Sequence, residues 1–162
     1  MVSVRAGGLD DPQVKALLRF HYADAHATTP AKHAFVLDAD GLASHDTIFF
    51  TAWEGDALTG MAALKSLESG HAEIKSMRTD PAHLNKGVGR ALLDRLIATA
   101  RARGLDRLSL ETGTGDSFVP ARALYRRFGF VDCAAFADYP ADSPHNQYMT
   151  LALKEARCPP SS

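Results

Sequence analysis

The sequence lacks the features that mark several specialised classes of protein. It has only two cysteines in 162 residues, Cys133 and Cys158, and they match neither a disulfide framework nor a zinc-ligand spacing. No apolar run reaches membrane-spanning length, and no charged-then-apolar leader opens the chain. These absences predict a reducing, cytoplasmic setting and no membrane partner.

An excess of charge of either sign is also missing. The 18 lysines and arginines nearly balance the 19 aspartates and glutamates, which leaves a formal net charge of −1. A near-neutral chain has no general attraction for polyanions, so we expect no nucleic-acid partner. The length suits one domain with a real core, which we place at residues 1–154, followed by a tail at residues 155–162.

What is present is a succession of helical and strand-like patterns. Apolar residues at helical spacing predict helices, and β-branched and aromatic residues between turns predict strands. The expected strands are residues 2–5, 47–53, 57–64, 72–79, 108–111, 130–136 and 147–153. The expected helices are residues 11–27 and a short helix at 30–37, which a loop at 38–41 follows. A third helix is expected to end at Gly104, and a fourth to be capped by Ser117 and to end at Gly129.

The strand at residues 72–79 has a fault in its alternation. Ala72 and Ile74 share one face, whereas the next apolar residue, Met77, falls on the other face. One extra residue reverses the facing of everything after it, so a β-bulge between Ile74 and Met77 would bring the apolar side chains together. A bulge would also leave a backbone group unpaired.

A basic glycine turn, Lys86-Gly87-Val88-Gly89-Arg90, joins this strand to an amphipathic helix. Free backbone N–H groups and the dipole at such a helix start favour an anion, and phosphate suits it best. The turn is not a P-loop, because no Gly-x-x-x-x-Gly-Lys-Ser/Thr run occurs. It is not a dinucleotide fingerprint either, because Leu92 stands at the third glycine position. Strand, helix and the next strand at residues 108–111 predict a parallel βαβ unit.

Three segments together resemble the GNAT superfamily of acetyl-CoA-dependent N-acetyltransferases. They are Glu73-Ile74-Lys75-Ser76-Met77-Arg78-Thr79-Asp80-Pro81, then Lys86 to Leu93, then Ala121-Arg122-Ala123-Leu124-Tyr125-Arg126-Arg127-Phe128-Gly129-Phe130. The family's first motif, Arg/Gln-x-x-Gly-x-Gly/Ala, follows a bulged strand, and its second is a helix with Leu-Tyr-x-x-x-Gly-Phe. Both occur here in order, and the resemblance covers the second half of the chain closely.

The resemblance implies a fold and a cofactor half-site. The fold is α/β (α+β), with a mixed, mostly antiparallel twisted sheet of six to seven strands, about four flanking helices and a parallel βαβ unit at the cofactor cleft. Acetyl-CoA would be the cosubstrate, and no metal would be needed. The residues expected to bind it are Met77, Arg78, Thr79, Asn85, Lys86, Gly87, Val88, Gly89 and Arg90. Leu84 stands at the family's Arg/Gln position, and Phe118 replaces an asparagine common near the start of the next helix.

The resemblance also implies roles in acetyl transfer. Tyr125 matches the family's tyrosine, whose hydroxyl lies near the cofactor sulfur and can protonate it. The amine acceptor must lose a proton, and two carboxylates are candidates for accepting it. Glu73 matches a strand position that supplies a carboxylate in some members, and Glu111 lies at the end of the parallel partner strand. The residues themselves leave the choice between them open.

The sequence also allows functions other than catalysis. The chain could be a CoA-binding sensor that lost catalysis, or a nucleotide-binding domain. A metal site at His21, Asp24 and His26 is disfavoured, because residues 21 and 26 do not share a helix face. Residues Asp138, Tyr139, Asn146 and Tyr148 fall in a region that often shapes the acceptor pocket of the family. The acceptor, a small-molecule or peptide amine, is not identified, and the resemblance allows a homodimer.

Overall fold

The computed structural model describes residues 1–28, 39–68 and 70–154. Within these ranges one mixed sheet has seven strands in the order β1-β2-β3-β4-β5-β7-β6. The strands are β1 (Ser3–Ala6), β2 (Thr47–Glu54), β3 (Ala57–Ser66), β4 (His71–Thr79), β5 (Arg107–Gly113), β6 (Val131–Cys133) and β7 (Asn146–Ala152). All neighbours are antiparallel except β4 and β5, so the predicted mixed sheet with its parallel βαβ unit is confirmed.

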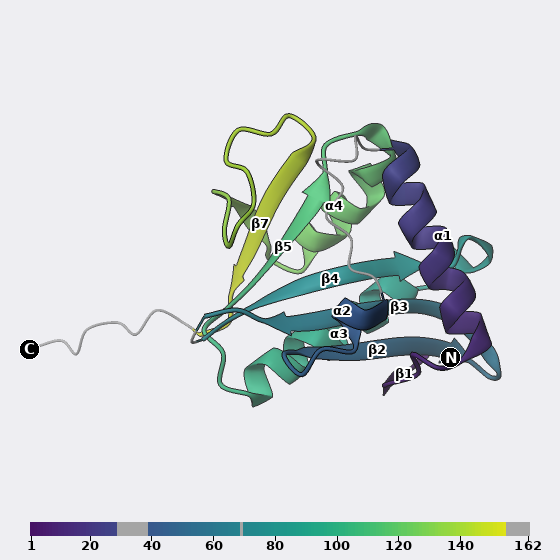
Figure 1. Cartoon of the computed structure of the whole chain (residues 1–162). Helices are drawn as coiled ribbons and strands as arrows, with labels where there is room; N and C mark the ends of the chain where they lie inside the picture. Colours follow the sequence, from purple (N-terminus) through teal and green to yellow (C-terminus); the bar gives the residue numbers. More distant parts are fainter. Residues whose placement is uncertain (29–38, 69, 155–162) are drawn as a thin grey trace, which may run out of the picture.

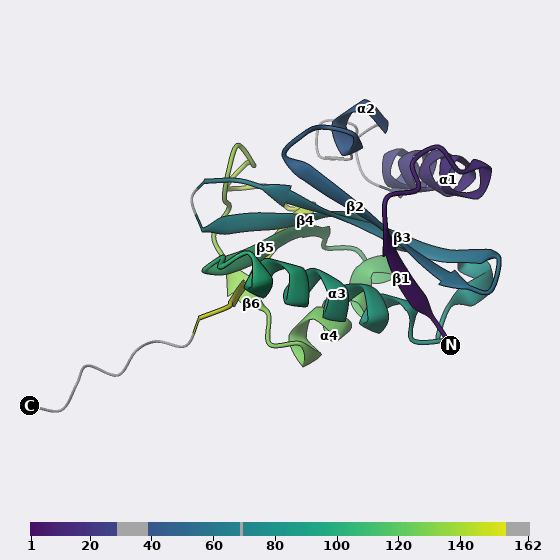
Figure 2. The same ribbon diagram turned by 90° about the horizontal axis from the view of Figure 1, so that it is seen from below.

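Helices cover both faces of this sheet. Helices α1 (Pro12–Thr28) and α2 (Ala39–Leu42) lie on one face, and α3 (Val88–Ala102) and α4 (Val119–Arg127) lie on the other (Figure 2). Two short 3-10 turns, η2 (Pro81–His83) and η3 (Asp116–Phe118), precede α3 and α4. The α3 face is packed on the larger apolar cluster, whereas the smaller cluster of the α1 face joins α1 and α2 to β2 and β3.

The helix ends follow the local sequence. Asp11 accepts a hydrogen bond from the Gln13 N–H at 2.8 Å, and Pro12 occupies the first turn, where its missing N–H costs nothing. Gly104 follows the end of α3 with a φ of 73°, and Gly129 follows α4 with a φ of 97°. Both glycines therefore end their helices in the left-handed conformation that the sequence predicted.

Several local predictions were wrong. Ser117 does not cap the helix: it lies inside η3, and α4 begins at Val119 without a side-chain cap. Phe118, the residue before α4, lies so close to Gly113 that a Cβ at Gly113 would be 2.2 Å from its ring. The strand expected at 130–136 is only the three residues of β6, because its pairing with β7 ends at Cys133. Residues 39–42, placed mostly in a loop, form α2, whereas the helix expected at 30–37 and the tail at 155–162 lie outside the described residues.

The predicted bulge is present in β4. Its register with β3 pairs Ala63 with Lys75 but Met61 with Arg78, so β3 advances two residues while β4 advances three. Ser76, in the extra stretch, has a φ of 53°, in the left-handed region. The bulge turns Met77 back toward the apolar cluster of the α3 face, which resolves the fault in alternation. Among the described residues, no helix is long and apolar enough to cross a membrane.

Candidate active site

The parallel strands β4 and β5 separate halfway along their length. They are paired only from His71 with Arg107 to Ile74 with Leu110, although β4 continues to Thr79 and β5 to Gly113. Figure 1 shows the two strands diverging beyond this point, with α4 beside the opening. A cleft of ≈ 1070 Å³ lies here, lined by both strands and by the starts of α3 and α4. A splayed parallel pair therefore creates an opening through the sheet.

The main chain of β4 presents hydrogen-bonding groups to this opening. In an antiparallel pair, successive residues direct their N–H and C=O groups to opposite sides of the strand. The Asp80 N–H donates to the Thr59 carbonyl of β3 at 2.8 Å, so the main-chain groups of Arg78 also face β3. Those of Met77 and Thr79 face the opening, where an extended ligand could add as a strand.

The start of α3 forms one lip of the cleft. Asn85 and Gly87 have φ values of 61° and 80°, and this turn brings the first N–H groups of α3 to the cleft. Gly89 lies against α4, because a Cβ there would be 2.9 Å from Leu124 Cδ2. The cleft is lined by Asn85, Gly87, Val88, Gly89 and Arg90, as well as Met77, Arg78 and Thr79, whereas Lys86 does not line it.

The two departures from the family motif also lie at this cleft. Leu84 is 57% exposed and lines it, so no arginine or glutamine side chain is available there. Phe118 lines it as well and packs on Gly113. Backbone N–H groups and the charge of Arg90 are what this lip offers to an anion.

The two faces of the sheet differ in chemistry around the opening. On the α3 face, Ile74, Leu110 and Tyr125 belong to the larger apolar cluster. On the α1 face, β4 and β5 present Glu73, Lys75, Arg78, Ser109 and Glu111, because these residues alternate with the apolar ones. A ligand passing through the opening would therefore meet apolar walls on one side and ionisable groups on the other.

Tyr125 lies on the apolar side. It is buried on α4, its ring packs edge-on against Phe130 with the centroids 5.9 Å apart, and it lines the cleft. Burial, with a smaller contribution from the Glu111 charge, raises the pKa of Tyr125 to about 12. The phenol therefore keeps its proton at neutral pH and can serve as a proton donor.

Glu73 lies on the opposite side in a closed polar cluster. Its Oε2 accepts a short hydrogen bond from the Tyr139 hydroxyl and lies 3.6 Å from Lys75 Nζ, which itself donates to Tyr139 Oη at 2.6 Å. Burial raises the pKa of Glu73, while the Lys75 charge and the Tyr139 hydrogen bond oppose that rise. Only 2% of Glu73 is exposed. The Glu73 carboxylate is thus paired with Lys75 and Tyr139 and largely shielded from solvent.

Glu111 is the second carboxylate of the cleft. Asn146 Nδ2 donates to its Oε1 at 2.6 Å, and burial raises its pKa more than this hydrogen bond lowers it. Glu111 is partly exposed and lines the cleft, and its pKa is lowered by the charge of Lys75 and, to a smaller extent, raised by the charge of Glu73. A carboxylate with a raised pKa at an open cleft has the character of a general base.

Arg78 makes a contact that sequence reasoning missed. Its guanidinium reaches α1, where Nε donates to His21 Nδ1 at 2.9 Å and Nη2 lies 2.8 Å from Asp24 Oδ2. Burial and the Arg78 charge lower the pKa of His21 to about 4, so the ring is neutral and accepts from Arg78. His21 and Asp24, set aside as metal ligands, thus tie α1 to the bulged strand. No signal in sequence links positions 57 residues apart.

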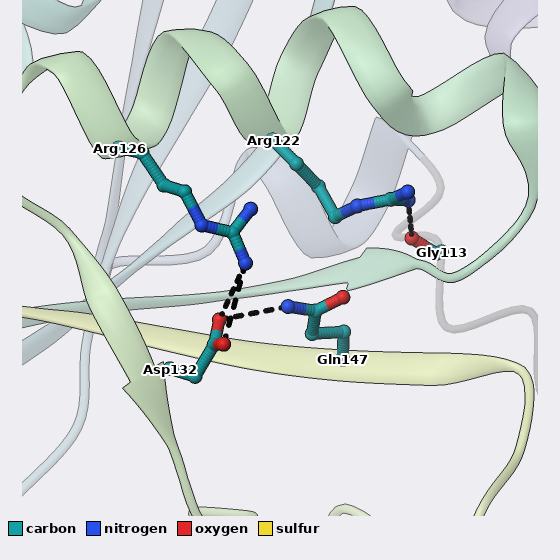
Figure 3. Close-up of polar contacts among 5 residues, drawn as sticks. All are labelled: Gly113, Arg122, Arg126, Asp132 and Gln147. Atoms are coloured by element: carbon teal, nitrogen blue, oxygen red, sulfur yellow. Dashed lines mark hydrogen bonds and ion pairs between the residues drawn. The ribbon is translucent and has the colours of Figure 1, made fainter.

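Two arginines of α4 anchor the helix that carries Tyr125 (Figure 3). Arg122 Nη1 donates to the Gly113 carbonyl at 2.8 Å and to the Gly115 carbonyl at 3.2 Å, which holds α4 to the end of β5. Arg126 Nη2 donates to Asp132 Oδ1 at 3.1 Å, an oxygen that also accepts from Gln147 Nε2 at 2.7 Å. The first contact lies at the cleft, and the second lies on the exposed outer side.

The remaining predicted residues lie around the acceptor side. Tyr139 and Asn146, expected to shape an acceptor pocket, contact the two carboxylates, and the Tyr148 hydroxyl donates to the Pro140 carbonyl at 2.6 Å. Cys133 is partly exposed in β6, and burial raises its pKa, which disfavours a nucleophilic thiolate. In the part of the chain that is described, no three His, Cys, Asp or Glu side chains are grouped to hold a metal ion.

Comparison with known proteins agrees with this geometry. The sequence profile of the acetyltransferase (GNAT) family matches residues 14–130. The uncharacterized N-acetyltransferase YedL of Escherichia coli is 39% identical over 96% of this chain and 97% of its own length. The corresponding protein YsnE of Bacillus subtilis is 43% identical over 93% of this chain and 99% of its own.

A solved structure shows the same fold. YncA of Salmonella typhimurium, a putative acetyltransferase solved with its cofactor acetyl-CoA, superposes with a TM-score of 0.71 at 22% identity over 99% of both chains. With the family profile and two full-length relatives above 30% identity, the chain belongs to the acetyltransferase (GNAT) family and is an acetyl-CoA-dependent acyltransferase.

Proposed function

We propose that the protein transfers an acetyl group from acetyl-CoA to a primary amine by direct attack in a ternary complex. The observation that carries this proposal is the opening between β4 and β5, which has a protonated tyrosine on one side and two carboxylates on the other. Acyl transfer to an amine uses one group that receives a proton from the amine and one that gives a proton to the leaving thiolate, and this opening offers both.

The α3 side of the cleft suits acetyl-CoA. The main-chain groups of Met77 and Thr79 would bond the pantetheine arm as an added strand. The N–H groups of residues 85–90 would hold the pyrophosphate at the start of α3, with Arg90 supplying positive charge. The Salmonella typhimurium protein of the same fold, solved with acetyl-CoA, supports this choice of cosubstrate.

The bonds and protons of the acetyl transfer balance with the groups that line the cleft. The neutral amine nitrogen bonds to the thioester carbonyl carbon, and the carbon–sulfur bond breaks as the tetrahedral intermediate collapses. A carboxylate takes the proton that the amine loses, and the Tyr125 hydroxyl gives its proton to the departing thiolate. Tyr125 then regains a proton from water, since its raised pKa makes the phenolate unstable near neutral pH.

Of the two carboxylates, Glu111 suits the base better. Glu73 is held by Tyr139 and lies beside Lys75, a cation that stabilises the carboxylate and weakens it as a base. Both carboxylates line the cleft, but Glu111 is partly exposed, has a neutral amide partner and interacts electrostatically with Tyr125. We assign Glu111 as base and Glu73 as a charged wall of the acceptor side.

The acceptor side supports an amine of a small molecule, an amino acid or a peptide. It carries the carboxylates of Asp24, Glu73 and Glu111 and the cations Lys75 and Arg78. Three carboxylates against two cations leave one negative charge in excess, and this charge would attract a protonated amine before it is deprotonated. Nothing in this charge pattern favours a polyanion such as nucleic acid.

Release of free CoA from acetyl-CoA with a panel of amines tests the function. Tyr125→Phe should lower kcat by about 100-fold to 10,000-fold, the usual contribution of a general acid. Binding of CoA should be unchanged, because the ring and its packing remain. Tyr22→Phe is the matched control, since Tyr22 is an exposed tyrosine of α1. A Tyr125→Phe enzyme as fast as the control would remove Tyr125 from the chemistry.

The pH profile separates the two carboxylates. With wild-type enzyme, the acid limb of kcat should lie above the ordinary glutamate pKa, because burial raises the pKa of Glu111. Glu111→Gln should abolish that limb together with most of the activity. Glu73→Gln should keep the limb but move it to lower pH, because the Glu73 charge then no longer raises the pKa of Glu111. Loss of the limb in Glu73→Gln and its retention in Glu111→Gln would make Glu73 the base.

A further inference from the structure

Ser76 has a conformation that its residue type does not favour. It stands in the bulge of β4 with a φ of 53°, where a side-chain Cβ crowds the following carbonyl oxygen. Glycine would occupy this position without that strain. The bulge itself therefore gives no reason for a serine.

The Ser76 hydroxyl carries a second cost. Its Oγ is buried and has no hydrogen-bond partner among the described residues. A buried hydroxyl without a partner destabilises a fold, and such groups in native structures call for an explanation. The neighbouring strand shows the usual alternative: Ser109 Oγ on β5 is also buried, but it bonds His71 Nε2 at 2.7 Å and Thr150 Oγ1 at 2.9 Å.

Both costs fall on a residue that lines the cleft. Ser76 lines it one residue before Met77, whose main chain faces the opening, and just past the point where β4 separates from β5. Glu73 precedes it on the acceptor side, and Tyr125 lines the same cleft on the cofactor side. Strained residues concentrate where ligands are held, so the unsatisfied hydroxyl fits a partner that arrives with the substrate.

We infer that the Ser76 hydroxyl donates a hydrogen bond to the thioester carbonyl oxygen of the bound acyl-CoA, which makes Ser76 a further catalytic residue. This inference rests on the proposed function. As the amine nitrogen bonds to the carbonyl carbon, negative charge develops on that oxygen, and a fixed donor in a dry site stabilises it. The charge leaves the oxygen when the carbon–sulfur bond breaks, and Ser76 neither gains nor loses a proton.

Two substitutions separate catalysis from stability. Ser76→Ala removes the unpartnered hydroxyl, and Ser76→Gly also removes the left-handed strain. Both variants should melt at or above the wild-type temperature, with Ser76→Gly higher. Both should lower kcat by about 100-fold, in the range found for loss of one oxyanion donor. Ser109→Ala is the control: it breaks two hydrogen bonds, so it should melt lower and keep its kcat.

A binding measurement tests the contact without turnover. Wild-type protein should bind acetyl-CoA more tightly than ethyl-CoA, a thioether without the carbonyl oxygen, and Ser76→Ala should lose that preference. A wild-type protein with the preference but no turnover on any amine would keep the contact and overturn the proposed function. Ser76→Ala with wild-type kcat and an unchanged preference would overturn the inference.

Discussion

Arg122 offers the sharpest test of how the fold positions Tyr125. Arg122 lies one turn before Tyr125 on α4 and donates to the carbonyl oxygens of Gly113 and Gly115 at 2.8 and 3.2 Å. Arg126 lies one turn after Arg122 and pairs with Asp132 at 3.1 Å on the outer side of the helix (Figure 3). The two residues have the same chemistry on the same helix, but only Arg122 connects that helix to the cleft.

The expected magnitudes differ. A hydrogen bond to a charged group contributes about 1.5–3 kcal/mol, and the Gly115 bond is longer and exposed, so Arg122→Met should lower the free energy of unfolding by about 2 kcal/mol. Arg126 and Asp132 are 49% and 61% exposed, and such pairs contribute about 0–1 kcal/mol. Methionine retains the apolar stem in both variants, so the difference isolates the guanidinium contacts.

Urea unfolding at constant m-value measures these losses, and CoA release measures kcat. Loss of the Arg122 contacts loosens the start of α4, and a displacement of about 1 Å can slow a reaction about 100-fold. Arg122→Met should therefore lose both stability and kcat, and Arg126→Met should lose little of either. Equal stability losses with unchanged kcat in both variants would refute the role given to Arg122.

Three further results are expected. His21 should contribute a rise in stability with pH between about 4 and 6.5, by up to about 3 kcal/mol, because burial and the Arg78 charge lower its pKa to about 4 and the unfolded chain binds the proton first. The raised pKa values of Glu73 and Glu111 act in the opposite direction, so the test compares wild-type and His21→Gln proteins: the urea midpoint should rise more from pH 5 to pH 7.5 in the wild type. Gly89→Ala should weaken acetyl-CoA binding in calorimetry, because the new Cβ would lie 2.9 Å from Leu124 Cδ2 and push α3 away from α4. An unchanged affinity would show that the Leu124 side chain moves instead and would contradict this expectation. Acetyl-CoA at 100 times its Kd should stabilise the protein by about 2.7 kcal/mol in thermal melts, whereas stabilisation by ATP instead would contradict the cofactor assignment.

Most of the cofactor half could be predicted from the sequence because it depends on local signals. The alternation fault around Met77 requires an extra residue wherever the strand pairs, so the bulge was predictable without any partner strand. Gly104 and Gly129 end their helices through their own backbone freedom. The prediction for Ser117 was wrong, because η3 and the packing of Phe118 on Gly113 before the start of α4 are not visible in a local pattern.

The contacts of the acceptor half could not be predicted, because they join residues far apart in the chain. Tyr139 reaches Glu73 across 66 positions, and Arg78 reaches His21 across 57. Side-chain hydrogen bonds over such separations produce no periodic pattern in the sequence, so the residues that form them look like isolated polar residues.

By itself the sequence determined the order of strands and helices, the bulge, the glycine-turned start of α3 and the motifs around Tyr125, since each depends on neighbours along the chain. Only the tertiary structure decided that β4 and β5 separate, that Glu73 is buried against Lys75 and Tyr139 while Glu111 stays partly exposed, and that the Ser76 hydroxyl lacks a partner among the described residues. The physical reason is that burial, pKa and unsatisfied hydrogen bonds are properties of the assembled surroundings of a side chain.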